Sequence, residues 1–347
     1  MIRTYEYIDT IHSRLNEYVL SFFQRIETDN GGFRDELFHP EFLPIVKRHR
    51  SILKDKFKII YDHVWSLSND ERQDFCQSII KSNEIENICN GTYTPRAFSN
   101  NPTGIDCILK KMFSDLYDNV LDGKPFRENA NTTLREHFNQ FSDKNFNHTL
   151  CPVCGIGELK KSHDKTREQY DHYLPKSLYP FSSVNFYNLV ICCKECNSLD
   201  VKADKDILAL PTRKVFFPYD RNHKDIRLSV VVKNYNSKIE EIEWEMLFST
   251  EDNKIEEIES WKSIYSIDSR YKGYIKGRIE KWYSAYYNIH SNIKLSGMSA
   301  SDIRLCYLES LEADESLGLS YIRRPTLEAL LVNLNIIEAE SETLKYT

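Results

Sequence analysis

Residues 151–197 read CPVCGIGELK KSHDKTREQY DHYLPKSLYP FSSVNFYNLV ICCKECN. Two C-x-x-C pairs bound this stretch, Cys151 with Cys154 and Cys193 with Cys196. A gap of two residues lets one tight turn present both sulfur atoms to a tetrahedral ion, so the two pairs predict a structural zinc site with four thiolate ligands. The 38 residues between the pairs exceed the loop of a minimal zinc ribbon. The site is therefore expected to hold further structure between its two halves.

A redox motif is the alternative interpretation of the paired cysteines. One C-x-x-C pair would suffice for redox chemistry, and no thioredoxin-like βαβ pattern surrounds either pair. Disulfides are typical of small secreted domains, and this chain does not have that character. We therefore favour metal binding. The other five cysteines are expected to be ordinary buried or free thiols: Cys76, Cys89, Cys107, Cys192 and Cys306.

The composition indicates a folded, mainly helical protein. The chain has 347 residues, 41% of them hydrophobic, enough for the cores of one large or two ordinary domains. Only 11 Gly and 11 Pro interrupt it, which favours helix over a loop-rich all-β fold. No apolar run reaches the roughly 18 residues needed to cross a bilayer, and charges interrupt the N-terminus where a signal peptide would be apolar. We expect a cytoplasmic protein with no membrane partner.

The charge argues against a protein that coats nucleic acid through bulk electrostatics. The formal net charge is −6, whereas phosphate neutralisation needs clustered Lys and Arg. Between Cys151 and Asp225, twelve Lys and Arg accompany ten Asp and Glu, a local charge of +2 that leaves −8 for the rest of the chain. The contrast is compatible with a local contact to nucleic acid and with acidic flanks that serve another purpose.

Three regions follow from the sequence pattern: a helical region over 1–144, a module rich in Cys, His, Pro and Asn over 145–225, and a third region over 226–347. In the first region, an N-terminal helix is predicted from apolar residues at steps of three and four: Ile8, Ile11, Leu15, Tyr18, Val19, Phe22 and Ile26. Further helices are predicted over 42–57, 70–82 and 104–121.

The third region begins with a predicted β-hairpin. Apolar residues alternate over 226–232 and again over 242–248, with the turn-forming residues 234–237 between them. An aromatic stripe then follows one side of a long predicted helix over 271–286. Such a stripe can stack on nucleobases, but at helical spacing it usually faces a core, which we favour. A last helix is predicted from Pro325 to Ile337.

The segments DHYLPKS at 171–177, NLV at 188–190 and CN at 196–197 carry a family resemblance. Together they resemble the HNH endonuclease family over about residues 151–206. The resemblance implies a ββα-metal module, that is, a two-stranded hairpin and a helix around one divalent cation, with zinc held by the four cysteines. The predicted fold class is thus α+β and mainly helical, with a central ββα-metal HNH module and a four-cysteine zinc site, flanked by helical regions and a β-hairpin.

The resemblance also assigns roles to four residues. It implies that His172 is the general base, that Asp171 and Asn197 bind a catalytic Mg²⁺ or Mn²⁺, and that Asn188 braces the loop that orients His172. The residue types fit this chemistry. Imidazole accepts a proton near neutral pH, and oxygen ligands suit a hard cation that keeps several waters. One metal ion is expected, because carboxylates for a second are not evident.

Two features leave the function open. Many relatives carry a Lys three residues after the last Asn, placed to meet phosphate, whereas this chain has Asp200 there and Lys202 two residues later. Phosphate contact by Lys202 is then one possibility, and Asp200 either favours metal binding or faces water. The alternative function is a non-catalytic zinc-ribbon module that binds protein or nucleic acid, with Asp171 and His172 capping a turn.

A narrower resemblance concerns residues 171–180 together with FPYD at 217–220 and the helical C-terminal region. These are similar to HNH proteins of bacterial anti-phage systems, notably the nuclease partner in Septu and some retron systems. This resemblance implies that the helical flanks dock onto an ATPase partner, which suits their acidic charge. It implies phosphodiester hydrolysis in nucleic acid, with DNA favoured over RNA. No recognition helix or base-reading motif indicates a sequence specificity.

Overall fold

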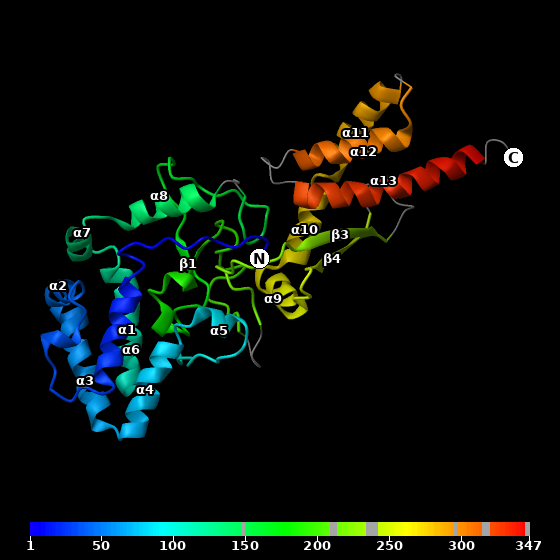
Figure 1. Cartoon of the computed structure of the whole chain (residues 1–347). Coiled ribbons are helices and arrows are strands. Elements are labelled where there is room, and N and C mark those ends of the chain that lie inside the picture. The colour runs from blue at the N-terminus through cyan, green and yellow to red at the C-terminus, as the bar shows by residue number, and fades with distance from the viewer. Residues whose placement is uncertain (147–149, 209–213, 234–241, 295–296, 314–319, 344–347) are drawn as a thin grey trace. The chain divides into compact units, whose positions relative to one another are not determined.

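The computed structural model describes residues 1–146, 150–208, 214–233, 242–294, 297–313 and 320–343 (Figure 1). The chain divides into two compact units. The N-terminal unit consists of Arg3–Asn147 and Leu159–His223, and the C-terminal unit of Met1–Ile2, His148–Glu158 and Lys224–Thr347. Each unit combines helices with one two-stranded antiparallel sheet. About 52% of the structure is helical, which confirms the α+β, mainly helical fold class.

The N-terminal unit is built on helices that precede a short sheet, formed by β1 (Tyr170–His172) and β2 (Leu189–Ile191). Helix α1 packs against α4, and α3 packs against both α4 and α6, so these four helices lie together (Figure 1). The helices are α1 (Leu15–Ile26), α2 (Leu43–Arg48), α3 (Asp55–Ser66), α4 (Asn69–Lys81), α5 (Ile85–Cys89), α6 (Gly104–Asp115), α7 (Lys124–Ala130) and α8 (Leu134–Asn145). Short 3₁₀ turns are η1 (Asp35–Leu37), η4 (Pro180–Ser182) and η5 (Phe186–Asn188), and one-turn π-helical segments are η2 (Arg50–Lys54) and η3 (Leu116–Val120).

The predicted N-terminal helix is present but starts later than its periodicity indicates. Helix α1 begins at Leu15, not at Ile8. The preceding backbone has other partners, because the Tyr5 N–H donates to the Pro218 carbonyl at 2.8 Å and Thr10 and Ser13 close a hydrogen-bonded turn. The apolar residues in front of Leu15 therefore belong to a segment that runs along other parts of this unit.

The other predicted helices of this unit are confirmed with changed boundaries. Helix α4 matches the prediction over 70–82 and starts with a capping box of Ser68 and Glu71, which satisfies the first backbone N–H groups. The segment 42–57 contains α2, η2 and the start of α3, because non-helical dihedral angles at His49 interrupt it. The segment 104–121 forms α6 and continues as the wider turn η3.

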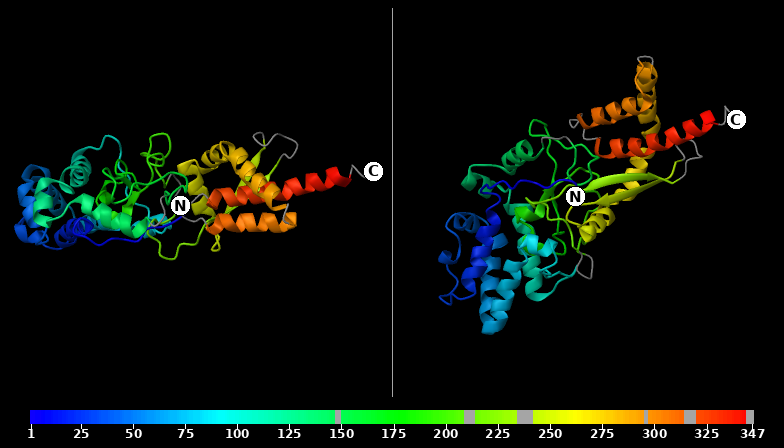
Figure 2. Two further views of the ribbon diagram at one scale, coloured as in Figure 1. Left: turned by 90° about the horizontal axis from the view of Figure 1, so that it is seen from above. Right: turned by 45° about the vertical axis from the view of Figure 1, so that its right-hand side comes forward.

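The C-terminal unit contains the predicted β-hairpin, formed by β3 (Arg227–Val232) and β4 (Trp244–Ser249). Along β3, buried and exposed residues alternate, because one face of the sheet is covered. Helix α13 lies along β3 (Figures 1 and 2). The predicted turn at 234–237 lies outside the described residues. The helices of this unit are α9 (Ile255–Tyr265), α10 (Ile267–Lys276), α11 (Ile279–Lys294), α12 (Ala300–Ala313) and α13 (Ser320–Thr343).

The aromatic stripe faces the core of this unit, as predicted. Tyr271, Tyr274, Trp282 and Tyr286 are all buried. The single long helix predicted there is instead two helices, α10 and α11, separated at Gly277. The last predicted helix is α13, which begins at Ser320 and carries Pro325 after its first turn. Within the part of the chain that the structure describes, no helix combines the length and apolar character needed to span a membrane.

Candidate functional site

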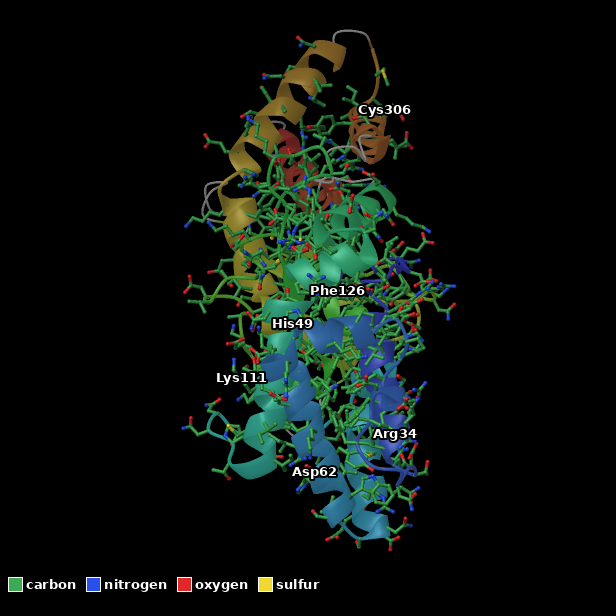
Figure 3. The ribbon with its side chains drawn as sticks, turned by 90° about the vertical axis from the view of Figure 1, so that its left-hand side faces the viewer. Arg34, His49, Asp62, Lys111, Phe126 and Cys306 are labelled. Carbon is green, nitrogen blue, oxygen red and sulfur yellow. The ribbon has the colours of Figure 1, made fainter. Side chains whose placement is uncertain are left out.

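The four cysteines of the two C-x-x-C pairs come together. The Sγ atoms of Cys151, Cys154, Cys193 and Cys196 all lie within 4.8 Å of one another, and all four residues are buried. Zinc with sulfur ligands at about 2.3 Å needs sulfur atoms roughly 3.8 Å apart, so small side-chain movements would complete a tetrahedron. This donor set fits a metal ion such as zinc. Of the other cysteines, three are buried and two exposed: Cys76, Cys89 and Cys192, then Cys107 and Cys306 (Figure 3).

The first C-x-x-C turn is closed by its own backbone. The Cys151 N–H donates to the Gly157 carbonyl at 2.7 Å, and the Gly155 N–H donates to the Cys151 carbonyl at 2.8 Å. Gly155 has a φ of +65°, and a Cβ atom there would meet Ile2 Cδ1 at 2.7 Å. The left-handed backbone conformation therefore favours glycine at this position, whereas the Ile2 side chain could move aside for a Cβ atom.

Two aromatic side chains of the C-terminal unit hold this turn from outside. Trp261 Nε1 donates to the Val153 carbonyl at 2.7 Å, and the Tyr271 hydroxyl donates to the Cys154 carbonyl at 2.9 Å. Both aromatic residues are buried, so these hydrogen bonds are shielded from water. The sequence pattern placed Tyr271 in a core stripe but gave no signal that its hydroxyl supports the metal-binding turn.

The second C-x-x-C turn follows β2 directly. The Asn197 N–H donates to the Cys193 carbonyl at 3.1 Å. Among the described residues from 192 to 208 the chain forms turns, not the helix that the ββα-metal resemblance implies. A local reason is Ala203, whose φ of +40° is incompatible with a right-handed helix. The structure therefore has a two-stranded sheet and the cysteine cluster here, and the ββα module itself stays a prediction.

Strands β1 and β2 place the candidate catalytic residues. They pair antiparallel, with Asp171 opposite Val190 and His172 opposite Leu189. On the other edge of β2, the Tyr219 hydroxyl donates to the Leu189 carbonyl at 2.6 Å. Both edges of this short strand thus have hydrogen-bond partners, which stabilises a sheet too small to be stable alone.

Asn188 forms hydrogen bonds within the loop between the two strands. Its Oδ1 accepts from the Leu174 N–H at 2.7 Å, and its Nδ2 donates to the Leu174 carbonyl at 3.1 Å and the Ser182 carbonyl at 3.2 Å. Asn188 is fully buried. One side chain therefore ties the start and the end of the loop together.

The loop fixes the orientation of the His172 ring. His172 Nε2 lies 2.9 Å from the Ser183 carbonyl, and the Ser183 hydroxyl donates to the Phe113 carbonyl of α6 at 2.6 Å. The Tyr117 ring packs edge-on against the imidazole, with centroids 4.3 Å apart. Because a carbonyl oxygen only accepts, Nε2 carries the proton and the lone pair of neutral His172 is on Nδ1.

Burial keeps His172 neutral. Only 9% of the residue remains exposed, and loss of solvation lowers its pKa to about 3, against a smaller opposing effect of the hydrogen bond to Ser183. The imidazole is thus able to accept a proton at neutral pH, although it is a weak base in this state.

Asp171 has a partner that the sequence did not indicate. The Lys202 ammonium donates to Asp171 Oδ1 at 3.0 Å, to the His172 carbonyl at 2.7 Å and to the Ala203 carbonyl at 3.3 Å. Asp171 Oδ2 lies 2.9 Å from the same nitrogen without hydrogen-bond geometry. Burial raises the pKa of Asp171, and the Lys202 charge opposes this shift.

The position of Lys202 bears on its predicted contact with phosphate. Lys202 is fully buried, so it does not offer its charge to a phosphate at the surface, while Asp200 is exposed. The sequence showed a lysine in an unusual position, but only the fold reveals that it returns to β1.

Asp171 and Asn197 do not form a metal site as they stand. Asn197 is half-buried, whereas Asp171 is buried and paired with Lys202. In the described part of the chain, the cysteine cluster is the one group of three or more His, Cys, Asp or Glu side chains arranged to hold a metal ion. With its carboxylate bound by Lys202, Asp171 does not fit a divalent cation in this state.

No protein-family model matches the chain, and no curated protein or solved structure is similar to it by comparison of sequence or structure. The resemblance to HNH endonucleases therefore rests on the motifs quoted from residues 151–206.

Proposed function

We propose that the chain is a metal-dependent HNH-type endonuclease, which hydrolyses phosphodiester bonds in nucleic acid with His172 as general base. DNA is favoured over RNA as the target. The motifs of residues 151–206 support this function. Their likeness to the nuclease of Septu and retron systems further suggests a role in bacterial anti-phage defence, with an ATPase partner bound by the helical flanks.

The observation that carries the proposal is the orientation of the His172 ring. A general base needs a lone pair held in one direction, and the contact of Nε2 with the Ser183 carbonyl leaves Nδ1 in that role. Asn188 fixes the same loop from its other side.

The low pKa of His172 has a consequence for this chemistry. Water that attacks phosphorus must lose a proton, and a base with a pKa of about 3 accepts it poorly. A phosphodiester anion bound beside the ring would favour the protonated imidazole and raise its pKa. In this proposal the base becomes effective when the substrate is bound.

The proposal involves two kinds of metal ion, one structural and one catalytic. The cysteine cluster could hold a metal ion such as zinc, and in this proposal it binds a structural Zn²⁺. A catalytic Mg²⁺ or Mn²⁺ at Asp171 and Asn197 requires that Lys202 first release the Asp171 carboxylate.

A second function, a non-catalytic zinc module that binds protein or nucleic acid, is favoured by one specific observation. The Asp171–Lys202 pair has the form of a structural ion pair, buried and held by backbone carbonyls. Under this alternative, His172 and Asp171 only stabilise the turn after β1.

A cleavage assay separates the two functions. Purified zinc-loaded protein is incubated with plasmid DNA, single-stranded DNA or RNA. Each substrate is tested with Mg²⁺, with Mn²⁺, and with EDTA in place of an added divalent ion. We expect cleavage that depends on the added divalent ion, strongest on DNA. Retention of nucleic acid on the protein without cleavage of any substrate, at any metal concentration, would instead indicate the binding module.

A further inference from the structure

The Lys202 ammonium is surrounded by oxygen atoms. It has three N–H groups, and three oxygen atoms accept from them: Asp171 Oδ1, the His172 carbonyl and the Ala203 carbonyl. A cation surrounded by a carboxylate and two carbonyl oxygens has the kind of ligand set that hard metal ions use. The difference is that the cation is part of the chain.

The burial of Lys202 makes this arrangement costly to maintain without Asp171. The lysine is 0% exposed and Asp171 6% exposed. Lysine is almost never fully buried unless it is paired, and removal of one partner from a buried ion pair leaves an uncompensated charge. Each of the two residues therefore depends on the other in this state.

A divalent ion and Lys202 cannot occupy the carboxylate together. Both carboxylate oxygens of Asp171 lie within 3.0 Å of Lys202 Nζ. A metal ion bound to the same oxygens at about 2.1 Å would place like charges in contact in a buried region. Binding of one cation thus excludes the other.

Two local features bear on whether the Lys202 side chain could move. It lies in a segment of turns, so its movement breaks no helix. Asp200 and Asp204 on either side are exposed, and either carboxylate offers a partner for a released ammonium. Lysine has a flexible four-carbon side chain, which makes such a swing possible without large backbone change.

We propose that Lys202 is a built-in cation that competes with a divalent metal ion for the Asp171 carboxylate. The inference deepens the proposed nuclease function, on which it rests for the identity of Asp171 as a metal ligand. In the state described here Lys202 occupies the site, and a metal ion binds only when the lysine has moved away.

The test is metal binding by Lys202→Met, which keeps the length of the side chain and removes its charge. The full-length zinc-loaded protein is titrated with Mn²⁺, followed by the electron paramagnetic resonance of free Mn²⁺ and by the melting temperature. We expect Lys202→Met to bind Mn²⁺ about tenfold more tightly than the parent, or better. It should melt at a lower temperature than the parent without Mn²⁺ and gain more from added Mn²⁺.

Two further variants make the result decisive. The double variant Asp171→Asn/Lys202→Met has no buried charge at this place and should bind no Mn²⁺ there, so it reports any unrelated site. Lys202→Gln can still donate to the backbone carbonyls, and it replaces Lys202→Met in the titration should the latter fail to fold. It should also bind Mn²⁺ more tightly than the parent.

Equal Mn²⁺ affinity of the parent and both single variants would overturn the inference and leave Lys202 as a structural partner of Asp171. These measurements do not use cleavage. Tighter Mn²⁺ binding by the variants of a protein that cuts no nucleic acid would support the competition and contradict the nuclease function. Cleavage of nucleic acid together with equal Mn²⁺ affinity of parent and variants would support the nuclease function and contradict the competition.

Discussion

Asn188 is the residue on which the geometry of the candidate site depends most. It is fully buried and makes hydrogen bonds to Leu174 and Ser182, residues that lie eight positions apart in the loop. Removal of the Asn188 side chain would leave these backbone groups of Leu174 and Ser182 without their hydrogen-bond partner, at a cost of about 1–3 kcal/mol for each group. The resemblance implies that Asn188 braces the loop that orients His172, and this role stays a prediction.

His12 is a buried polar residue with no counterpart in the sequence analysis. It is 0% exposed, neither ring nitrogen has a hydrogen-bond partner among the described residues, and its ring packs against Phe126 of α7. Loss of solvation lowers its pKa from 6.5 to about 4, although the charges of Asp122 and Glu136 oppose the shift. The folded protein therefore holds this ring neutral in a pH range where the unfolded chain protonates it.

This difference predicts acid sensitivity. The folded-state pKa lies below that of the unfolded chain, so the stability contributed by His12 is complete above about pH 6.5 and is lost as the pH falls towards 4. The shift corresponds to roughly 3 kcal/mol across this range. His12→Leu should lose less stability than the parent between pH 6.5 and 4 in urea denaturation of the whole chain. Parallel pH profiles for the two proteins would show that His12 does not carry the effect.

At the scale of elements, the two C-x-x-C turns are supported in different ways. The first is closed by its own backbone and by the Trp261 and Tyr271 side chains. The second continues from β2, whose outer carbonyls accept from the Tyr5 and Tyr219 hydroxyls. Zinc would stabilise turns whose backbone is already arranged.

The adjacent residues Cys192 and Cys193 offer a matched test of this metal site. Both are buried, but only Cys193 belongs to the cluster. Cys193→Ser should lose most of its bound zinc and melt at a clearly lower temperature, because thiolate–zinc binding contributes directly to folding. Cys192→Ser should keep its zinc. Zinc content is measured by atomic emission on protein washed with a weak chelator, and equal zinc retention by both variants would contradict the four-cysteine site.

The sequence predicted those elements whose signal is local. Helical sequence patterns located α4 and α6, alternation located β3 and β4, and the spacing of the cysteines located the cluster. Boundaries were less accurate where tertiary hydrogen bonds decide, as in front of Leu15. The break at Gly277 was missed because the apolar pattern continues through it.

The site was predicted in part for the same reason. The motif positions located His172 and Asn188, whose hydrogen bonds depend on the short loop between β1 and β2. The pairing of Lys202 with Asp171 spans 31 residues and depends on turns that no periodicity records. The hydroxyl of Tyr271 likewise acts on a residue 117 positions away.

At the scale of the whole chain, the β1–β2 segment shares a core with the helices that precede it. Phe181 of η4 packs against Phe113 of α6 with ring centroids 5.1 Å apart, and both residues are buried. Ser183, whose carbonyl orients His172, is joined to the same helix, because its hydroxyl donates to the Phe113 carbonyl. The N-terminal helices therefore help to set the geometry of the candidate base.

The most direct test of the central claim is the initial rate of DNA cleavage by zinc-loaded His172→Ala, compared with the parent and with His163→Ala. His163 is exposed and nearby in sequence, so it controls for loss of a histidine. We predict that His172→Ala keeps its zinc and loses about 100-fold or more of the cleavage rate, as expected for a missing general base, while His163→Ala cleaves like the parent. Cleavage by His172→Ala at the parental rate would contradict the assignment of His172 as the base.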